Sequence, residues 1–500
     1  MRVGVCSPLT IPPSPELRAF DLIPVKTCRP RLPEAGAMNA VIAPPVFDAS
    51  LIARYDGNGP RYTSYPTALQ FGPGFDEKAL RATIAASNLA ALPRPLSLYV
   101  HVPFCASPCF YCGCNRVITR DAARGRDYLR TLTAEIAQAG ALFDPDRPVN
   151  QLHLGGGTPN FFDLESMGAL MAALGRHFTL AQPGQREFGI ELDPRHADGD
   201  YVRGLAQLGF NRVSVGIQDF DPAVQEAVNR VQSLAQTRAV LDAARDSGYR
   251  STSVDLIYGL PRQTREGFAR TLDAVAELAP DRVAVYGYAH MPQLFKAQTQ
   301  IDAAELPPPA ERLALFGLAL EKLTAAGYLY IGMDHFARPE DDLVRAQRAG
   351  SLQRNFQGYS TCGECDIVGL GPSAISRIGD SYSQAIRDLA GYTLAVQNGH
   401  LPVARGIALS RDDRLRREAI GALMCHGDLD TGAFAQRHEL DFTHYFADAL
   451  GRLRELEQDG LVALADGHIR VTPSGRLLLR HVAMSFDAYQ PQQPGGSRLI

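Results

Sequence analysis

The stretch YVHVPFCASPCFYCGCNR (residues 99–116) contains four cysteines within ten positions: Cys105, Cys109, Cys112 and Cys114. The first three have the spacing Cys-x3-Cys-x2-Cys on a loop that directly follows a strand-like run. A structural zinc site needs four ligands in paired, short-spaced knuckles, and the sequence has no second knuckle near this loop. Three cysteines suit a [4Fe–4S] cluster, because they leave one iron open to a small molecule. The spacing therefore predicts an iron–sulfur centre with Cys105, Cys109 and Cys112 as its metal ligands.

The composition of the chain excludes several classes of protein. Nine cysteines, spread unevenly over 500 residues, argue against a disulfide scaffold and for the reducing cytoplasm. The net charge of −4 gives no reason to expect nucleic acid or an anionic membrane as a partner. No apolar run approaches the roughly 18–20 residues that span a bilayer. We therefore expect a cytoplasmic globular protein without a membrane span.

From about residue 96, short strand-like runs alternate with amphipathic helical segments. Repeated strand–helix units predict parallel strands joined by right-handed crossovers. Six such units are fewer than the eight of a complete barrel, which leaves a partial barrel or an open doubly wound sheet. The predicted strands cover 96–102, 151–156, 187–193, 212–218, 252–259 and 282–290, and three predicted helices cover 126–143, 233–249 and 265–280.

Several predicted strands have one polar face. A fully buried parallel strand normally reads as a continuous apolar run, whereas residues 187–193 and 212–218 alternate apolar with polar side chains. Glu191, Gln218 and Asp255 lie near strand C-termini, where parallel α/β folds place their active sites. The pattern predicts polar side chains that line an interior cavity; the alternative is that they are rim residues bonded to loops.

The cysteine loop resembles that of the radical S-adenosylmethionine (SAM) enzymes, in which the open iron binds the amino and carboxylate groups of SAM. Tyr111 lies where that family places a residue against the adenine, and GGGTP (155–159) resembles its glycine-rich turn. The resemblance implies a [4Fe–4S] cluster that cleaves SAM to a 5′-deoxyadenosyl radical. It also implies an α/β fold, a partial (β/α)6 TIM-like barrel with a smaller, mainly helical C-terminal domain.

Four segments are predicted along the chain. The proline-rich residues 1–45 are expected to be a disordered leader or an over-extended start, with Met38 as a more ordinary beginning. Residues 46–95 are expected to form an N-terminal segment that covers the site, and 96–345 the radical SAM partial barrel. Residues 346–500 are expected to form the mainly helical C-terminal domain, which ends in a helix–hairpin–helix pattern resembling a winged helix.

Further motifs narrow the resemblance to the oxygen-independent coproporphyrinogen III oxidases, from about residue 54 to the C-terminus. They include GPRYTSYPTA (59–68), YCGCN, IELDPR, GIQDF, DLIYGLP and NFQGY. The resemblance implies an enzyme that decarboxylates two propionate side chains of coproporphyrinogen III to vinyl groups, giving protoporphyrinogen IX for haem biosynthesis. It also implies an electron donor for the cluster and a monomeric protein.

The resemblance implies a set of site residues as well, because that family is described with two SAM molecules in one site. Cys114 matches the fourth cysteine of the family motif and is expected in the site but off the cluster, as a proton or hydrogen donor near the substrate. For Arg230, which lies well past its strand, the alternative is a surface arginine. The positions that match the first SAM are Tyr99, Gly156, Glu191 and Ile375, and those that match the second are Tyr111, Gly157, Thr158, Gln218, Arg230, Asp255 and Ala289.

Some alternatives stay open at this point. Cys362 and Cys365 form a Cys-x2-Cys pair, which is interpreted as two incidental loop thiols, with redox chemistry as the other reading. A related family keeps the three cysteines but acts as a haem-binding chaperone, and another radical enzyme of this kind opens the haem ring. Cys114 and the 59–67 stretch favour the oxidase over the chaperone. A zinc-bound structural protein is disfavoured by its ligand count.

Overall fold

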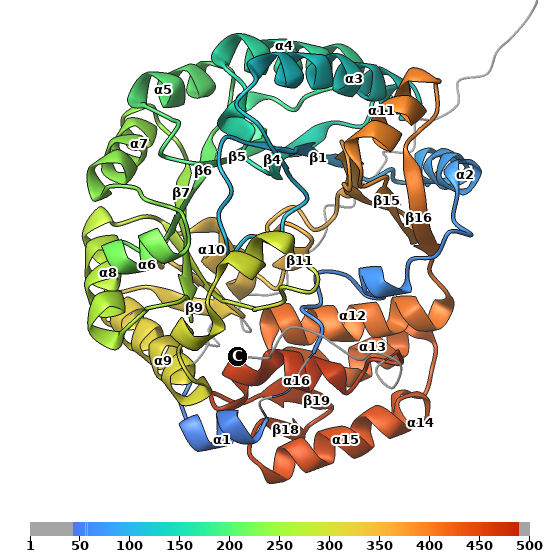
Figure 1. Cartoon of the computed structure of the whole chain (residues 1–500). Helices are drawn as coiled ribbons and strands as arrows, with labels where there is room; N and C mark the ends of the chain where they lie inside the picture. The colour runs from blue at the N-terminus through green and yellow to red at the C-terminus, as the bar shows by residue number, and fades with distance from the viewer. Residues whose placement is uncertain (1–43, 56, 58, 490–500) are drawn as a thin grey trace, which may run out of the picture. The chain divides into compact units, whose positions relative to one another are not determined.

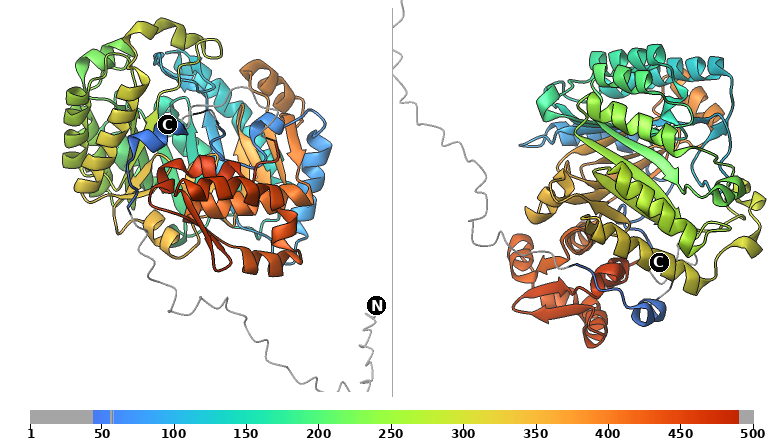
Figure 2. Two further views of the ribbon diagram at one scale, coloured as in Figure 1. Left: turned by 90° about the horizontal axis from the view of Figure 1, so that it is seen from below. Right: turned by 90° about the vertical axis from the view of Figure 1, so that its left-hand side faces the viewer.

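Six parallel strands in chain order, β1, β4, β5, β6, β7 and β8, form the centre of the main sheet. The computed structural model describes residues 44–55, 57 and 59–489 (Figure 1). Helices follow each of these strands and lie around the outside of the sheet (Figures 1 and 2). The strands of the main sheet are β1 (Leu96–Val102), β4 (Val149–Gly156), β5 (Glu187–Leu192), β6 (Arg212–Gln218), β7 (Ser251–Tyr258), β8 (Arg282–Gly287), β9 (Leu329–Gly332), β10 (His335–Ala337), β13 (Asp366–Leu370), β14 (Ile375–Ile378), β15 (Ser381–Ala385) and β16 (Val403–Ala408).

The other elements are the helices and three small sheets. The helices are α1 (Ala49–Arg54), α2 (Glu77–Asn88), α3 (Ala122–Gly140), α4 (Leu164–His177), α5 (Gly199–Gln207), α6 (Pro222–Ala227), α7 (Leu234–Asp246), α8 (Arg265–Leu278), α9 (Pro309–Ala325), α10 (Asp342–Arg348), α11 (Leu389–Gln397), α12 (Arg411–His426), α13 (Thr431–His438), α14 (Phe442–Tyr445), α15 (Ala447–Gln458) and α16 (Leu479–Met484). The remaining strands are β2 (Phe104–Cys105), β3 (Val117–Ile118), β11 (Gln353–Asn355), β12 (Gly358–Ser360), β17 (Asp428–Asp430), β18 (Val462–Ala465) and β19 (His468–Val471).

The predicted partial (β/α)6 barrel is confirmed, and both of its edges are extended. On one side β13 pairs with β1 in parallel, and β14, β15 and β16 continue the sheet in antiparallel fashion. On the other side the short strands β10 and β9 follow β8. The expected boundary at residue 346 precedes β13–β16, so the sheet reaches beyond the segment that the sequence assigned to the barrel.

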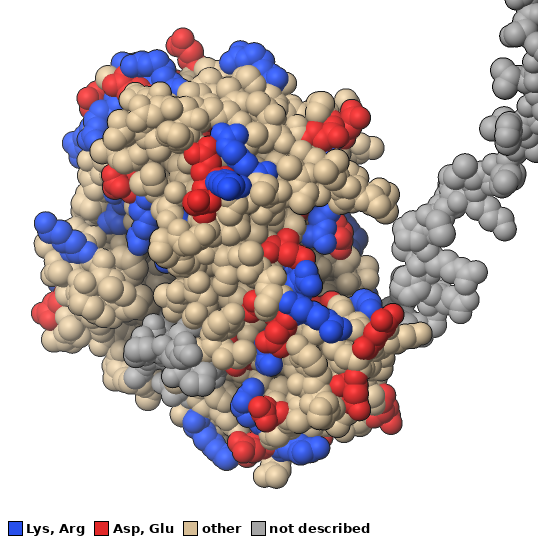
Figure 3. Space-filling model, turned by 90° about the vertical axis from the view of Figure 1, so that its right-hand side faces the viewer, with Lys and Arg blue, Asp and Glu red and all other residues tan. Residues whose placement is uncertain are grey.

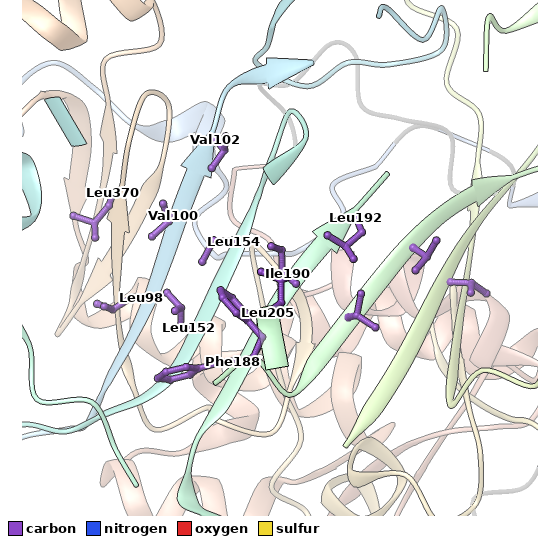
Figure 4. Packing of buried hydrophobic residues seen from close by; sticks show 14 of the residues in the cluster. Leu98, Val100, Val102, Leu152, Leu154, Phe188, Ile190, Leu192, Leu205 and Leu370 are labelled. Carbon is purple, nitrogen blue, oxygen red and sulfur yellow. The ribbon is translucent and has the colours of Figure 1, made fainter. Parts of the chain in front are cut away.

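Side-chain alternation divides each barrel strand between an outer and an inner face. Leu98, Val100 and Val102 of β1 are fully buried against the helices, as are Leu152 and Leu154 of β4 (Figure 4). Each such side chain stabilises the fold by about 1.5–3 kcal/mol through removal from water. The polar residues of the other face remain partly accessible along β5, β6 and β7, as the alternating sequence predicts for strands around an interior site.

The C-terminal region contains the predicted helix–hairpin–helix, namely α15, the β18–β19 hairpin and α16. Strand β17 adds a third strand to this hairpin. The segment before α2 lies between this region and the barrel: Arg61 pairs with Asp334, and the Tyr62 hydroxyl donates to Asp487 over 2.9 Å. The expected leader, residues 1–45, falls almost entirely outside the described residues.

Of the helices in the described part of the chain, none combines the length and the apolar composition that crossing a membrane requires. On the face drawn in Figure 3, acidic and basic side chains are interspersed, and neither sign forms a large patch there.

A buried carboxyl group on α3 gives the stability of the fold a pH dependence. Glu135 accepts hydrogen bonds from the Gly371 amide (2.7 Å) and the Tyr392 hydroxyl (2.6 Å), and burial raises its pKa to about 7. A raised carboxyl pKa means that the folded protein holds the proton more tightly than the unfolded chain. Its contribution to stability is therefore complete below the unfolded pKa and is lost as the pH rises toward about 7.

We expect Glu135→Gln to flatten this pH dependence, because the amide oxygen can accept the same two hydrogen bonds without ionising. In the unmodified chain the free energy of unfolding should fall by up to about 1.4 kcal/mol for each pH unit between the two pKa values. Urea unfolding from pH 4.5 to 7.5 measures the difference, with the exposed Glu277→Gln as control. Parallel stability–pH curves for Glu135→Gln and the unmodified chain would contradict the assignment.

Candidate functional site

The cysteine loop leaves the C-terminal end of β1 and is tied at its base. Strand β2 pairs in parallel with β3, which sets Cys105 opposite Ile118. The Val117 amide donates to the Pro103 carbonyl over 2.7 Å and the Thr119 amide to the Cys105 carbonyl over 2.9 Å. These bonds fix both ends of the segment that carries Cys109, Cys112 and Cys114.

Arg116 holds the middle of the loop. Its Nη1 donates to the Cys112 carbonyl (3.0 Å) and its Nη2 to the Cys109 carbonyl (3.1 Å). The guanidinium thus bridges two of the predicted ligands through their backbone and adds a positive charge beside the thiols.

The four thiols are free and lie among hydrogen-bond donors. The Thr158 hydroxyl donates to Cys105 Sγ (3.3 Å), and Arg230 donates to Cys109 Sγ (3.5 Å). The hydrogen bond from Cys114 lowers the pKa of Cys112 to about 6, whereas burial raises the pKa of Cys105 to about 11. Cys114 is exposed, and its amide lies 3.4 Å from Cys112 Sγ.

Three thiols on one loop are a donor set that an iron–sulfur cluster could use. In the residues that the structure describes, no three His, Cys, Asp or Glu side chains converge as the ligands of one metal ion would. A single zinc ion requires its ligand atoms at about 2.0–2.3 Å, whereas the cysteines of a [4Fe–4S] cluster each bind a different iron and stand farther apart. Thiols that accept hydrogen bonds from Thr158 and Arg230 also match the way proteins tune such clusters.

Arg230 is buried beside the cysteine loop, so the alternative of a surface arginine is wrong. It is 6% exposed and forms an ion pair with Asp193 (3.2 Å), while its Nη2 donates to the Gly216 carbonyl (2.7 Å). Arg195 pairs with the same carboxylate at 2.6 Å and donates to Cys109 Sγ at 3.6 Å. Although burial opposes ionisation, Arg195 and Arg230 lower the pKa of Asp193 to about 2.

The glycine-rich turn follows β4 and lies against the cysteine loop. Gly156 has a φ of +113°, and a Cβ there would lie 2.6 Å from the His101 ring. A Cβ at Gly157 would lie 2.8 Å from the backbone of Pro103 and Phe104. Only glycine allows this close backbone approach, which places the turn beside the strand that carries Cys105.

Polar side chains of the inner face connect β1, β4 and β5. The Tyr99 hydroxyl lies 3.2 Å from His101 Nδ1, and the Tyr99 ring stacks on His153 with a centroid distance of 6.1 Å. His153 in turn contacts Glu191 at 3.1 Å. The structure therefore brings Tyr99 and Glu191 together through a histidine to which the sequence had assigned no role.

Asp255 and Gln218 belong to the same inner face. The Ser214 hydroxyl donates to Asp255 over 3.1 Å, and burial together with the negative charge of Glu191 raises the pKa of Asp255 to about 7. Gln218 sits at an irregularity between β6 and β7 with a φ of 69°. A Cβ at Gly216 would meet both the Gln218 amide and the Arg230 guanidinium, so these two groups approach each other.

The remaining predicted positions are placed by backbone contacts. Gln298 Nε2 donates to the carbonyls of Tyr111 (2.9 Å) and Ala289 (3.2 Å), which joins the cysteine loop to the segment after β8. Ile375 opens β14, and its backbone lies against Gly369, the partner of Tyr99 across the β1–β13 pair. Sequence reasoning gave no role to Asp193, Arg195, His153 or Gln298; the first two lie in the IELDPR motif that it quoted.

The chain is similar to known proteins over most of its length. The family model described as the radical SAM superfamily matches residues 99–275, and the HemN C-terminal domain matches residues 409–478. An oxygen-independent coproporphyrinogen III oxidase from Pseudomonas aeruginosa is 49% identical over 89% of this chain and 96% of its own length. The Escherichia coli protein of the same name is 46% identical over 89% of this chain and 96% of its own length. The solved structure of coproporphyrinogen III oxidase from Escherichia coli, described as a radical SAM enzyme, superposes with a TM-score of 0.84 at 45% identity, over 89% of this chain and 100% of that one.

Proposed function

The chain belongs to the oxygen-independent coproporphyrinogen III oxidases of the radical SAM superfamily, and on this premise we propose that it decarboxylates two propionate side chains of coproporphyrinogen III. The products are two vinyl groups, and the porphyrinogen becomes protoporphyrinogen IX in haem biosynthesis. The observation that carries the proposal is the loop of free cysteines held against the glycine-rich turn at the C-terminal edge of a partial barrel.

Cys105, Cys109 and Cys112 would hold the [4Fe–4S] cluster, and the family membership implies both this cluster and SAM. When bound, the two together supply the radical that removes a hydrogen from a propionate side chain. The protein orients the reacting groups and excludes water and oxygen. Arg116, Arg195 and Arg230 surround the loop with positive charge, which favours the anionic thiolates that ligate iron.

We propose that two SAM molecules occupy the site, each with its own residues. We call the residues proposed for each SAM molecule the first and the second group. The first group is supported by the link between Tyr99 and Glu191 through His153, and by the close backbone approach at Gly156. Support for the second comes from the approach of Gln218 to Arg230 and from the Gln298 bridge between Tyr111 and Ala289. Arg230 suits a carboxylate, whereas Glu191 and Asp255 suit an ammonium group or a ribose diol. The first group is completed by Ile375, and the second by Gly157, Thr158 and Asp255.

We further propose that Cys114 donates a hydrogen near the substrate and does not bind the cluster. Its exposed position and its contact with Cys112 support this role. An external electron donor for the cluster and a monomeric enzyme complete the proposal, as the family resemblance implies, and the cysteine usage supports a reducing cytoplasmic location.

Anaerobic turnover tests the proposed function directly. Cluster-reconstituted protein is combined with a reductant, SAM and coproporphyrinogen III, and the products are read by mass spectrometry. We expect a porphyrin that has lost two carbon dioxide units, with 5′-deoxyadenosine formed alongside. If deoxyadenosine forms without decarboxylated porphyrin, the protein is a radical SAM enzyme that acts on another substrate. If neither product forms and the protein binds haem, a haem chaperone is favoured.

The raised pKa of Asp255 gives the proposed SAM site a measurable pH dependence. Below about pH 7 the carboxyl group is protonated and loses its attraction for an ammonium group. The affinity for SAM should therefore weaken by up to about tenfold for each pH unit below this value. Equilibrium binding of SAM from pH 6 to 8 measures the effect, and Asp255→Asn should show a flat profile. An unchanged profile in Asp255→Asn would remove the residue from the proposed site.

A further inference from the structure

Cys362 and Cys365, which the proposed function does not use, sit in a tight turn between β12 and β13. The Cys365 amide donates to the Cys362 carbonyl over 3.3 Å. A turn of this kind brings its first and last Cα atoms within about 7 Å, close to the range of about 4.4–6.8 Å found in disulfides. Both residues are free cysteines.

The turn is held in place by its neighbours. Arg377 on β14 donates from Nη2 to the carbonyls of Gly363 (2.8 Å) and Cys365 (2.7 Å). The Ser360 hydroxyl accepts from the Cys362 amide at 3.1 Å. Because the turn is held from β12 and from β14, its conformation is kept, and a bond between the two cysteines requires little rearrangement of the backbone.

The two thiols differ in access and in acidity. Cys365 is 2% exposed, whereas Cys362 is only partly buried. The residues between them, Gly363 and Glu364, line a cavity of about 500 Å³. The hydrogen bond from Cys365 lowers the pKa of Cys362 and raises that of Cys365. A partly exposed thiol of lowered pKa beside a buried partner is the arrangement of a reactive and a resolving cysteine.

We propose that Cys362 and Cys365 form a redox-active dithiol, which low-molecular-weight disulfides oxidise reversibly to an intrachain disulfide. The Cys362 thiolate attacks one sulfur of the external disulfide RSSR, which forms a Cys362–SR bond and releases RS⁻. Cys365 then loses its proton to solvent and attacks the Cys362 sulfur, which releases a second RS⁻. The two protein thiols lose two electrons, and the external disulfide gains them; two RSH molecules reverse the reaction.

The test uses the cluster-loaded full chain under anaerobic conditions with oxidised glutathione, followed by alkylation and peptide mass mapping. We expect a Cys362–Cys365 disulfide that reduced glutathione reverses. Cys365→Ser should instead accumulate one glutathione on Cys362, because no resolving thiol remains. In Cys362→Ser the buried Cys365 should react roughly tenfold more slowly or not at all. Cys425→Ser, which removes another buried cysteine, serves as the matched control and should behave like the unmodified chain.

Three results would overturn the proposal. The first is that Cys362 and Cys365 stay reduced in oxidised glutathione. The second is a disulfide between either residue and another cysteine of the chain. The third is that glutathione adds to Cys365 in Cys362→Ser as fast as it adds to Cys362 in Cys365→Ser. If a variant does not fold, the alkylation rates of the individual cysteines in the unmodified chain test the same proposal. Cys362 must then be modified about tenfold faster than Cys365 and Cys425.

Discussion

Replacement of Cys105, Cys109 or Cys112 by alanine is expected to abolish both cluster binding and the formation of 5′-deoxyadenosine. The three thiols lie on one short loop, where Cys105 and Cys109 accept hydrogen bonds from Thr158 and Arg230, and a three-cysteine site has no spare protein ligand. Because the cofactor supplies the hard chemistry, the loss of a ligand leaves no partial route to the product. Iron and sulfide content, the visible absorption spectrum and deoxyadenosine by mass spectrometry measure the effect.

Two further cysteine variants make this prediction specific. Cys425→Ala removes a buried thiol from α12, far along the chain from the loop, and should keep the iron content and activity of the unmodified chain. Cys114→Ala should keep its iron but lose porphyrin product, since Cys114 is proposed to act beside the cluster. Loss of iron in Cys114→Ala would instead make it a ligand, and full iron in Cys109→Ala would contradict the proposed ligand set.

The centre of the fold could be predicted from the sequence because its signals are local. The runs 96–102 and 212–218 coincide with β1 and β6, since alternation of apolar and polar residues depends only on neighbours along the chain. The same alternation identified Glu191, Gln218 and Asp255 as an inner face before any contact was known. The polar face of these strands is therefore the sequence feature that predicts where the proposed site lies.

The edges of the sheet and the support of the site could not be predicted in this way. Strand β13 is five residues long, and its parallel pairing of Gly369 with Tyr99 joins parts of the chain that are distant in sequence. Such pairings leave no periodic trace in either segment. The Asp193–Arg230 ion pair likewise depends on how two loops meet at the sheet edge, so only the structure assigns Arg230 to the buried side.

Gly157→Ala is expected to lower turnover by about 10²-fold while the chain remains folded. The φ angle of Gly157 lies outside the left-handed range, so alanine meets no backbone strain there; the obstacle is purely steric. Its Cβ would lie 2.8 Å from the Pro103 and Phe104 backbone, and backbone cannot rotate aside as a side-chain end can. The strand that leads into Cys105 must therefore shift by several tenths of an ångström, which displaces the proposed ligand relative to the turn.

Matched glycine variants separate this steric effect from a general loss of stability. Gly168→Ala on α4 has its nearest neighbouring atom at 3.8 Å and should keep full activity, with a stability gain of up to about 1 kcal/mol. Gly156→Ala combines a φ of +113° with a 2.6 Å approach to the His101 ring and should impair folding as well as turnover. Turnover and iron content, measured beside thermal unfolding, distinguish the three variants. Wild-type turnover in Gly157→Ala would show that the turn and the cysteine loop can separate without cost, and that their close approach does not position the proposed cluster.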